Sequence, residues 1–149
     1  MKLIKKYFLN DFAGAWIFFT IFPKLPRIYP RFKNITQYAP LLGIIIGYIQ
    51  CLIFTGLTNN SWPIFASAAI CIVSGFFITG GLHIDGLMDT FDGLYAGKDK
   101  FIKAMKDSRV GAFGVQAIIY VTLIQLASLI KIQDNICLLY TSPSPRDRQ

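Results

Sequence analysis

The sequence predicts an all-α protein, namely a polytopic membrane helix bundle with about three full spans and an N-terminal interfacial helix. Of its 149 residues, 54% are hydrophobic and only 15% are charged, whereas a soluble domain carries about 25% charged residues. The apolar residues are concentrated in long runs, two of which contain no charge. Because a helix needs about 20 apolar residues to cross a bilayer, composition and run length together predict membrane helices.

The three predicted spans cover residues 38–57, 62–82 and 112–130. The first two are separated by residues 58–61, a short polar turn without charge. Each run has the length that a spanning helix requires. We therefore expect two antiparallel spans, a long polar connection, and a third span.

Residues 7–22 form a shorter apolar segment that contains Asp11, which favours a helix lying in the membrane interface. The basic residues cluster in two stretches, 24–33 and 98–109, separated by two predicted spans. The positive-inside rule then places both stretches in the cytoplasm. A spanning segment at 7–22 would put the N-terminal lysines outside, so the interfacial interpretation is favoured. No small-residue cleavage site follows, so we expect this segment to be retained.

We expect residues 1–137 to form one membrane-embedded domain, and residues 138–149 a disordered or foreign tail. The tail is predicted because the composition changes abruptly to Ser, Pro and Arg. The net charge of +7 comes from basic residues in short loops beside apolar runs. With no nucleic-acid-binding motif, we expect the lipid bilayer as a partner and no nucleic acid. The three scattered cysteines predict neither a redox nor a metal site.

Three aspartates, Asp85, Asp89 and Asp92, follow the second predicted span at spacings of four and three residues. On a helix this spacing places all three carboxylates on one face. Their mutual repulsion, larger near a membrane, favours a bound divalent cation. Oxygen ligands suit Mg²⁺, which usually takes one or two carboxylates, substrate phosphates and waters. The plainer alternative is a solvated acidic face; the surrounding glycines favour the metal site.

A second group of polar residues comprises Lys106, Ser108 and Arg109, just before the third predicted span. Arginine suits bidentate contacts with phosphate, so these residues are candidates for binding a diphosphate. The alternative is a basic anchor at the membrane surface. His83, the only histidine, either takes part in phosphate binding or proton transfer, or packs at the interface.

The most specific features of the sequence are two long motifs, GGLHIDGLMDTFDGL at 80–94 and MKDSRVGAFG at 105–114. They resemble the signature of the cobalamin synthase family (adenosylcobinamide-GDP ribazoletransferase), as do FFTIFP at 18–23 and YAPLLG at 38–43. The resemblance extends over about residues 10–130 and covers little more than the first half of family members. We therefore expect the 149-residue chain to be inactive alone.

The resemblance implies the last stage of cobalamin assembly, in which adenosylcobinamide-GDP is joined to α-ribazole or α-ribazole 5′-phosphate with release of GMP. It implies that residues 1–137 are the N-terminal part of a membrane-embedded transferase domain, in a multi-pass enzyme of the cell (inner or plasma) membrane, and it is compatible with an oligomer. The positive-inside rule adds that the catalytic loop is cytoplasmic. Mg²⁺ would be held by Asp85, Asp89 and Asp92, and phosphate by Lys106 and Arg109. Either Asp92 or Asp107 would be the general base.

Three alternatives predict different behaviour of the aspartates. CDP-alcohol phosphotransferases use similar chemistry, but the chain lacks their pattern, in which the first two aspartates are followed by Gly, Ala and Arg. A cation-transport element would line an ion path with these carboxylates. A purely structural membrane subunit would tolerate Asn or Ala at all three positions.

Overall fold

The computed structural model describes the backbone of residues 2–141 and the side chains of residues 7–132, and this part of the chain is helical without a strand. The all-α prediction is thereby confirmed. The elements are α1 (Lys2–Phe19), the short 3₁₀ helix η1 (Ile35–Tyr38), α2 (Ala39–Asn59), α3 (Ile64–Ile78), α4 (Leu82–Tyr95), α5 (Phe101–Met105) and α6 (Ala112–Thr141).

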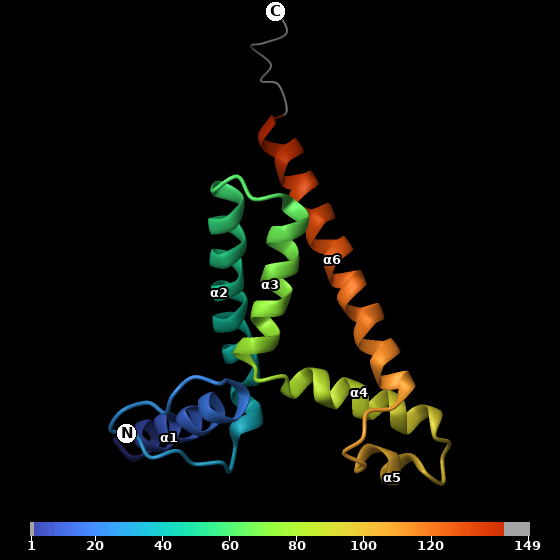
Figure 1. The fold of residues 1–149 in the computed structure, drawn as a ribbon. Helices are drawn as coiled ribbons and strands as arrows, with labels where there is room; N and C mark the ends of the chain where they lie inside the picture. The colour runs from blue at the N-terminus through green and yellow to red at the C-terminus, as the bar shows by residue number, and fades with distance from the viewer. Residues whose placement is uncertain (1, 142–149) are drawn as a thin grey trace, which may run out of the picture.

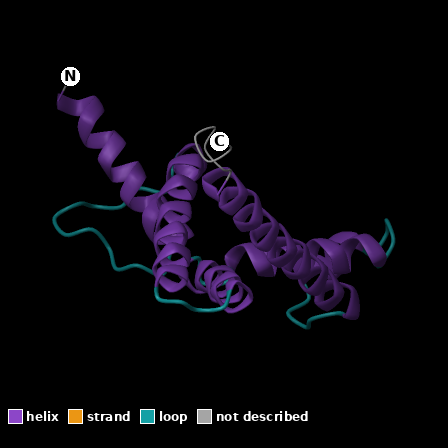
Figure 2. Cartoon of the chain, turned by 90° about the horizontal axis from the view of Figure 1, so that it is seen from above, coloured by secondary structure: helices purple, strands orange, loops and turns teal. Residues whose placement is uncertain are grey.

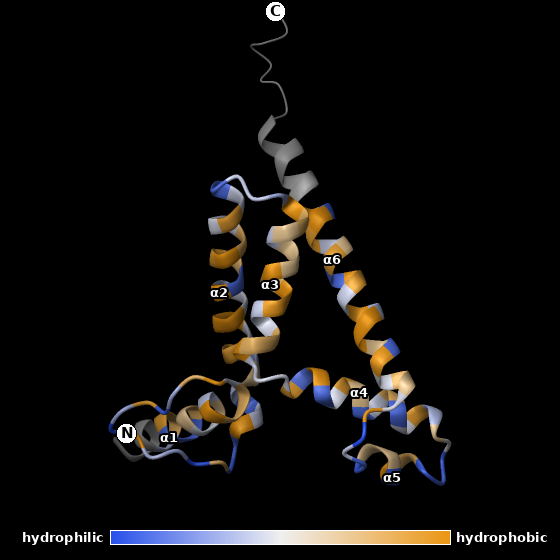
Figure 3. Cartoon of the chain, viewed as in Figure 1, coloured by the Kyte–Doolittle hydropathy of each residue, from blue (hydrophilic) through white to orange (hydrophobic). Residues whose placement is uncertain are grey.

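The helices form an upright group and a group that lies across its base. Figure 1 shows α2 and α3 side by side, with α6 leaning against α3 and diverging from it toward α4. Helices α1 and α4 lie across the lower ends of the upright helices, and α5 lies below α4. Figure 2 shows the same arrangement from above, with helices joined by loops. Figure 3 shows that polar residues gather on α1, α4, α5 and the loops beside them, while the described parts of α2, α3 and α6 are mostly apolar.

Two helical segments are long and apolar enough to cross a membrane, Ile35–Asn59 and Ala112–Ile132. A third candidate is the pair formed by α3 and α4, which is bent by 89°. The described helices thus provide two spans, or up to three if the bent pair counts as one. These apolar helices indicate a membrane protein.

The second predicted span, 62–82, was too long. Helix α3 has only 15 residues, or roughly 22 Å, less than the ~30 Å hydrocarbon core. It ends because Gly80 and Gly81 have φ values of 60° and 76°, in the left-handed region that side chains with a β-carbon disfavour. The chain then turns sharply into α4.

The third predicted span begins at Ala112, as expected, and α6 continues to Thr141. The helix therefore includes the first residues of the segment predicted as a tail, 138–141. Residues 142–149 lie outside the described part of the chain, so the tail stays a prediction.

Helix α1 is connected to the following loop through Asp11, the charge that made residues 7–22 a poor span. Asp11 is only 3% exposed, and Arg31 donates to its two carboxylate oxygens at 2.5 and 2.9 Å. The backbone N–H of Arg31 also donates to the Asn10 carbonyl at 2.9 Å. Gly14 permits this approach, because a β-carbon there would overlap the Arg31 carbonyl. An apolar cluster of Ala15, Tyr38 and Leu42 then fixes α1 against η1 and α2.

Candidate functional site

Helix α4 carries the three predicted aspartates and packs against the beginning of α6. With 3.6 residues per turn, Asp85, Asp89 and Asp92 lie within about 60° of one another around the helix axis. Asp85 is exposed, whereas Asp89 and Asp92 are half-buried. The predicted acidic face is therefore present, and its last member is turned toward α6.

Both carboxylate oxygens of Asp92 accept hydrogen bonds from the start of α6. The Gly111 N–H donates to Oδ2 at 2.7 Å and the Gly114 N–H to Oδ1 at 2.8 Å. Gly111 occupies the N-cap position, since its carbonyl accepts the first helical bond, from Val115. The first amides of a helix have no partner within the helix. Asp92 thus caps α6 from a different helix.

The two glycines are required by this close approach. A β-carbon at Gly111 would overlap the Asp92 carboxylate. A β-carbon at Gly114 would lie 2.6 Å from Asp92 Oδ2 and 3.0 Å from the Met88 carbonyl oxygen. The VGAFG sequence therefore allows the first turn of α6 to rest directly on α4.

The acidic face borders two separate open cavities. Asp85 lines the first, of about 560 Å³, at the turn between α3 and α4. Asp92 lines the second, of about 540 Å³, between α4 and the segment that precedes α6. The first cavity is lined by Phe18, Thr20, Ile21, Thr79, Gly80, Gly81, Leu82, Ile84, Asp85 and Met88. The second is lined by Asp92, Tyr95, Ala96, Ala104, Asp107, Arg109, Val110, Gly111, Ala112 and Phe113.

The three predicted magnesium ligands differ in the hydrogen bonds that they already make. Within the described residues, no three or more His, Cys, Asp or Glu side chains lie close enough together to hold a metal. Asp92 is engaged with α6, whereas no other side chain in this part of the structure bonds to Asp85 or Asp89. Mg²⁺ needs only one or two protein carboxylates when phosphate oxygens and waters complete its shell. The donor chemistry of Asp85 and Asp89 is therefore suitable for Mg²⁺.

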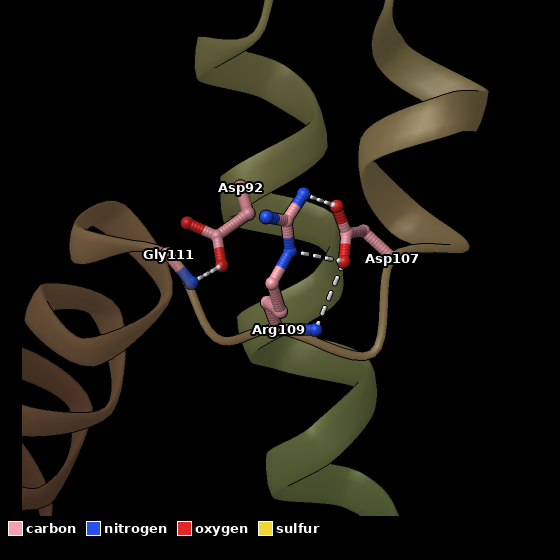
Figure 4. Close-up of polar contacts among 4 residues, drawn as sticks. All are labelled: Asp92, Asp107, Arg109 and Gly111. Atoms are coloured by element: carbon pink, nitrogen blue, oxygen red, sulfur yellow. Dashed lines mark hydrogen bonds and ion pairs between the residues drawn. The ribbon is translucent and has the colours of Figure 1, made fainter.

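Asp107 and Arg109 form a local ion pair in the loop before α6. Arg109 Nε and Nη2 donate to the two Asp107 oxygens at 3.0 and 2.7 Å, and the Arg109 backbone N–H donates to Oδ1 at 3.1 Å. Figure 4 shows the guanidinium bonded to Asp107, and Asp92 lines the same cavity. These bonds to Arg109 lower the pKa of Asp107 from 3.8 to about 2. Asp107 is thus a weak base at neutral pH, since an effective general base has a pKa near the working pH.

The other predicted site residues, Lys106, Ser108 and His83, take no part in the Asp107–Arg109 ion pair or in the contact of Asp92 with α6. Lys106 and Ser108 are exposed on the same loop as Arg109. His83 is exposed at the start of α4, where its ring stacks on Phe19 of α1 at 6.3 Å. His83 lines neither of the two cavities above. The observed contact of His83 is therefore packing against α1, and a part in proton transfer or phosphate binding stays a prediction.

Sequence reasoning missed two aromatic residues of the second cavity. The rings of Tyr95 on α4 and Phe113 on α6 stack with their centroids 4.0 Å apart and their planes 7° apart. Both residues line the cavity that contains Asp92 and Arg109. The available signal was their position, because Tyr95 closely follows Gly93 and Phe113 lies between Gly111 and Gly114.

The sequence is similar to a protein family and to several known proteins. Residues 11–145 match the family model described as cobalamin-5-phosphate synthase. Two proteins from different strains of Prochlorococcus marinus, both named adenosylcobinamide-GDP ribazoletransferase, are 48% and 46% identical over 125 and 124 residues. These alignments cover 84% and 83% of this chain and 48% of each relative.

A relative of the same name from Trichormus variabilis is 37% identical over 132 residues, which are 87% of this chain and 52% of that protein. The chain spans about half the length of the curated relatives it matches. No solved structure is significantly similar to it. The resemblance carried by the two sequence motifs is confirmed, and the chain belongs to the cobalamin-5-phosphate synthase family.

Proposed function

We propose that the full-length protein carrying this sequence joins adenosylcobinamide-GDP to α-ribazole or α-ribazole 5′-phosphate and releases GMP, in the cell membrane. The names of the relatives support this reaction. The structural observation that carries it is the placement of Asp92 of the acidic helix and Arg109 of the basic loop in one cavity. A diphosphate substrate needs cationic groups on its oxygens, which Arg109 offers in this cavity. It also needs carboxylates for a metal, which Asp85 and Asp89 offer on the same helix as Asp92.

The proposed metal ligands are Asp85 and Asp89, one helical turn apart on α4. Asp92 belonged to the predicted ligand set, but its oxygens already accept the two α6 amides. When bound, Mg²⁺ supplies charge neutralisation for the diphosphate and for the departing phosphate. The chain's own part is to hold this charge beside the substrate, and the exposed carboxylate of Asp85 at an open cavity supports that role.

Arg109, Lys106 and Ser108 are the proposed phosphate ligands. Asp107 uses Nε and Nη2 of Arg109, but a guanidinium has further N–H donors. The ion pair orients Arg109 and leaves its other donors for a phosphate oxygen. Because phosphoryl transfer depends mainly on positioning and charge stabilisation, the proposal does not require Asp107 as a strong base.

The proposed orientation places α4, α5 and the loop before α6 in the cytoplasm. The support is the excess of lysine and arginine between residues 98 and 109, which the positive-inside rule assigns to the cytoplasmic side. A cytoplasmic site is also where phosphorylated substrates would be encountered.

Complementation tests the proposed reaction. The full-length protein would be expressed in a bacterium that lacks its cobalamin synthase, with and without Asp89→Asn. Asp99→Asn is the matched control, because Asp99 is an exposed residue of the neighbouring loop. We expect growth from the parent and Asp99→Asn, and none from Asp89→Asn.

Growth with Asp89→Asn would keep the enzyme but remove Asp89 from the essential site. Failure of the parent despite good membrane expression would overturn the assignment and favour the phosphotransferase or transport alternatives. Ion flux in vesicles that depends on Asp89, with synthase activity unchanged by Asp89→Asn, would identify a transporter.

A further inference from the structure

We infer that Asp92 is a positioning residue that fixes α6 to α4, and that it is not a ligand of the metal. The inference deepens the proposed function, on which its kinetic part rests, and it divides the three aspartates into two functional groups. The pair of hydrogen bonds from Gly111 and Gly114 to Asp92 is called the Asp92 clamp below.

The first argument is electrostatic. Asp92 binds the N-terminal amides of a long helix, and such an end acts like a charge of roughly +0.5. This field stabilises a carboxylate, whereas it opposes a divalent cation placed against the same group. Asp85, located two turns earlier on α4, accepts no such bond within the described structure.

The second argument is steric. The side of Asp92 that faces α6 has no free space, because even a β-carbon at Gly111 or Gly114 would overlap the carboxylate or approach it to 2.6 Å. The backbone of α6 therefore occupies the position that a ligand would take on that side. The carboxylate is held by two bonds whose donors come from a rigid helical turn, which fixes its orientation.

The third argument concerns what the clamp connects. Gly111 is two residues after Arg109, and Asp92 is three residues after Asp89 on the same helix. Fixing Gly111 to Asp92 therefore sets where the basic loop lies relative to the proposed metal ligands. A shift of about 1 Å in such a contact can reduce a rate by on the order of 10²-fold.

Substitutions on both sides of the clamp separate positioning from metal binding. The full-length protein in lipid nanodiscs would carry Asp92→Asn, Gly111→Ala or Asp89→Asn. Mn²⁺, as a probe for Mg²⁺, would be titrated by electron paramagnetic resonance, and kcat measured per folded enzyme. We expect Asp92→Asn and Gly111→Ala to lower kcat by similar factors, with half-saturation by Mn²⁺ unchanged. Asp89→Asn should raise that half-saturation at least about tenfold, because it removes one of two charged ligands.

Weaker Mn²⁺ binding in Asp92→Asn, with normal kcat and binding in Gly111→Ala, would overturn the inference. If Asp92→Asn does not fold, Gly111→Ala decides, because it disturbs the clamp and leaves the carboxylate in place. Hydrogen exchange of the Gly111 and Gly114 amides gives a readout that needs no turnover. Both should be protected in the parent protein, and fast exchange there would also overturn the clamp. An inactive parent with protected amides would instead reject only the proposed function.

Discussion

Arg31 donates two hydrogen bonds to Asp11, a buried carboxylate located 20 residues earlier on α1. The pair explains how the largely apolar α1 accommodates a charge, since a buried carboxylate without a partner is strongly unfavourable. It also keeps the loop between α1 and η1 close to the helix, together with the Tyr7 ring, which lies 4.7 Å from the Arg31 guanidinium. The ion pair is therefore one of the contacts that hold this loop against α1.

Replacing Arg31 with alanine should destabilise the protein, because Asp11 would remain buried without its partner. We expect the apparent Tm in detergent to fall by several degrees, measured by a thermal-shift assay on the full-length protein. Lys24→Ala is the matched control, since Lys24 is an exposed cation of the same loop. An equal fall in Tm in both variants would show that the positive charge of the loop matters, and not the Arg31–Asp11 ion pair.

The Asp107–Arg109 ion pair predicts a pH dependence. The pKa of Asp107 is lowered to about 2 by bonds from Arg109, so its stabilising contribution is full above the ordinary value of 3.8 and is lost as the pH falls through about 2. Arg109→Gln should return the pKa of Asp107 toward 3.8. Carboxyl ¹³C NMR titration of the parent and the variant would measure this; a titration of Asp107 that is the same in both would contradict the pairing.

Two glycine substitutions of the same size should have opposite effects. Gly114→Ala should lower the Tm, because the added β-carbon would lie 3.0 Å from the Met88 carbonyl oxygen and 2.6 Å from Asp92. Gly43→Ala in α2 has nothing within 4 Å of the added carbon in the described structure. Alanine is favoured over glycine inside a helix by about 0.5–1 kcal/mol. Gly43→Ala should therefore keep or slightly raise the Tm, and a loss as large as that of Gly114→Ala would contradict this packing.

The turn between α3 and α4 should depend on backbone conformation at Gly81. Its φ is 76°, and within the described part of the chain no neighbouring atom lies within 4 Å of an added β-carbon. Conformational strain is therefore the main effect expected to oppose substitution. Asparagine tolerates the left-handed region far better than β-branched residues do. We expect Gly81→Val to reduce the yield of folded protein and Gly81→Asn to retain most of it, as measured by size-exclusion chromatography. Similar yields would show that Gly81 need not be left-handed.

In the proposed transferase, Arg109→Lys should raise KM for adenosylcobinamide-GDP about tenfold, because lysine lacks the planar fork that binds two oxygens at once. Steady-state kinetics of the full-length enzyme would measure the change. Lys98→Ala, an exposed lysine of the connecting loop, should leave KM unaltered. An unchanged KM in Arg109→Lys would exclude a bidentate contact of Arg109 with phosphate.

The helical class, the apolar runs and the helical phase of Asp85, Asp89 and Asp92 could be predicted from the sequence, because they depend on local composition and periodicity. The family was also evident from two motifs. The end of α3 could not be predicted from hydropathy, since residues 79–82 carry no charge that would end a span. The left-handed Gly80 and Gly81 turn the chain there.

The partners of each charged side chain were decided by tertiary structure. Asp92 shares its helix face with Asp85 and Asp89, but its bonds go to Gly111 and Gly114, about twenty residues away. Residue spacing alone established which carboxylates share a face, because helical geometry follows from spacing. Only the packing of α6 on α4 decided that one of them accepts the amides of a helix end, because that bond requires two segments distant in sequence to meet.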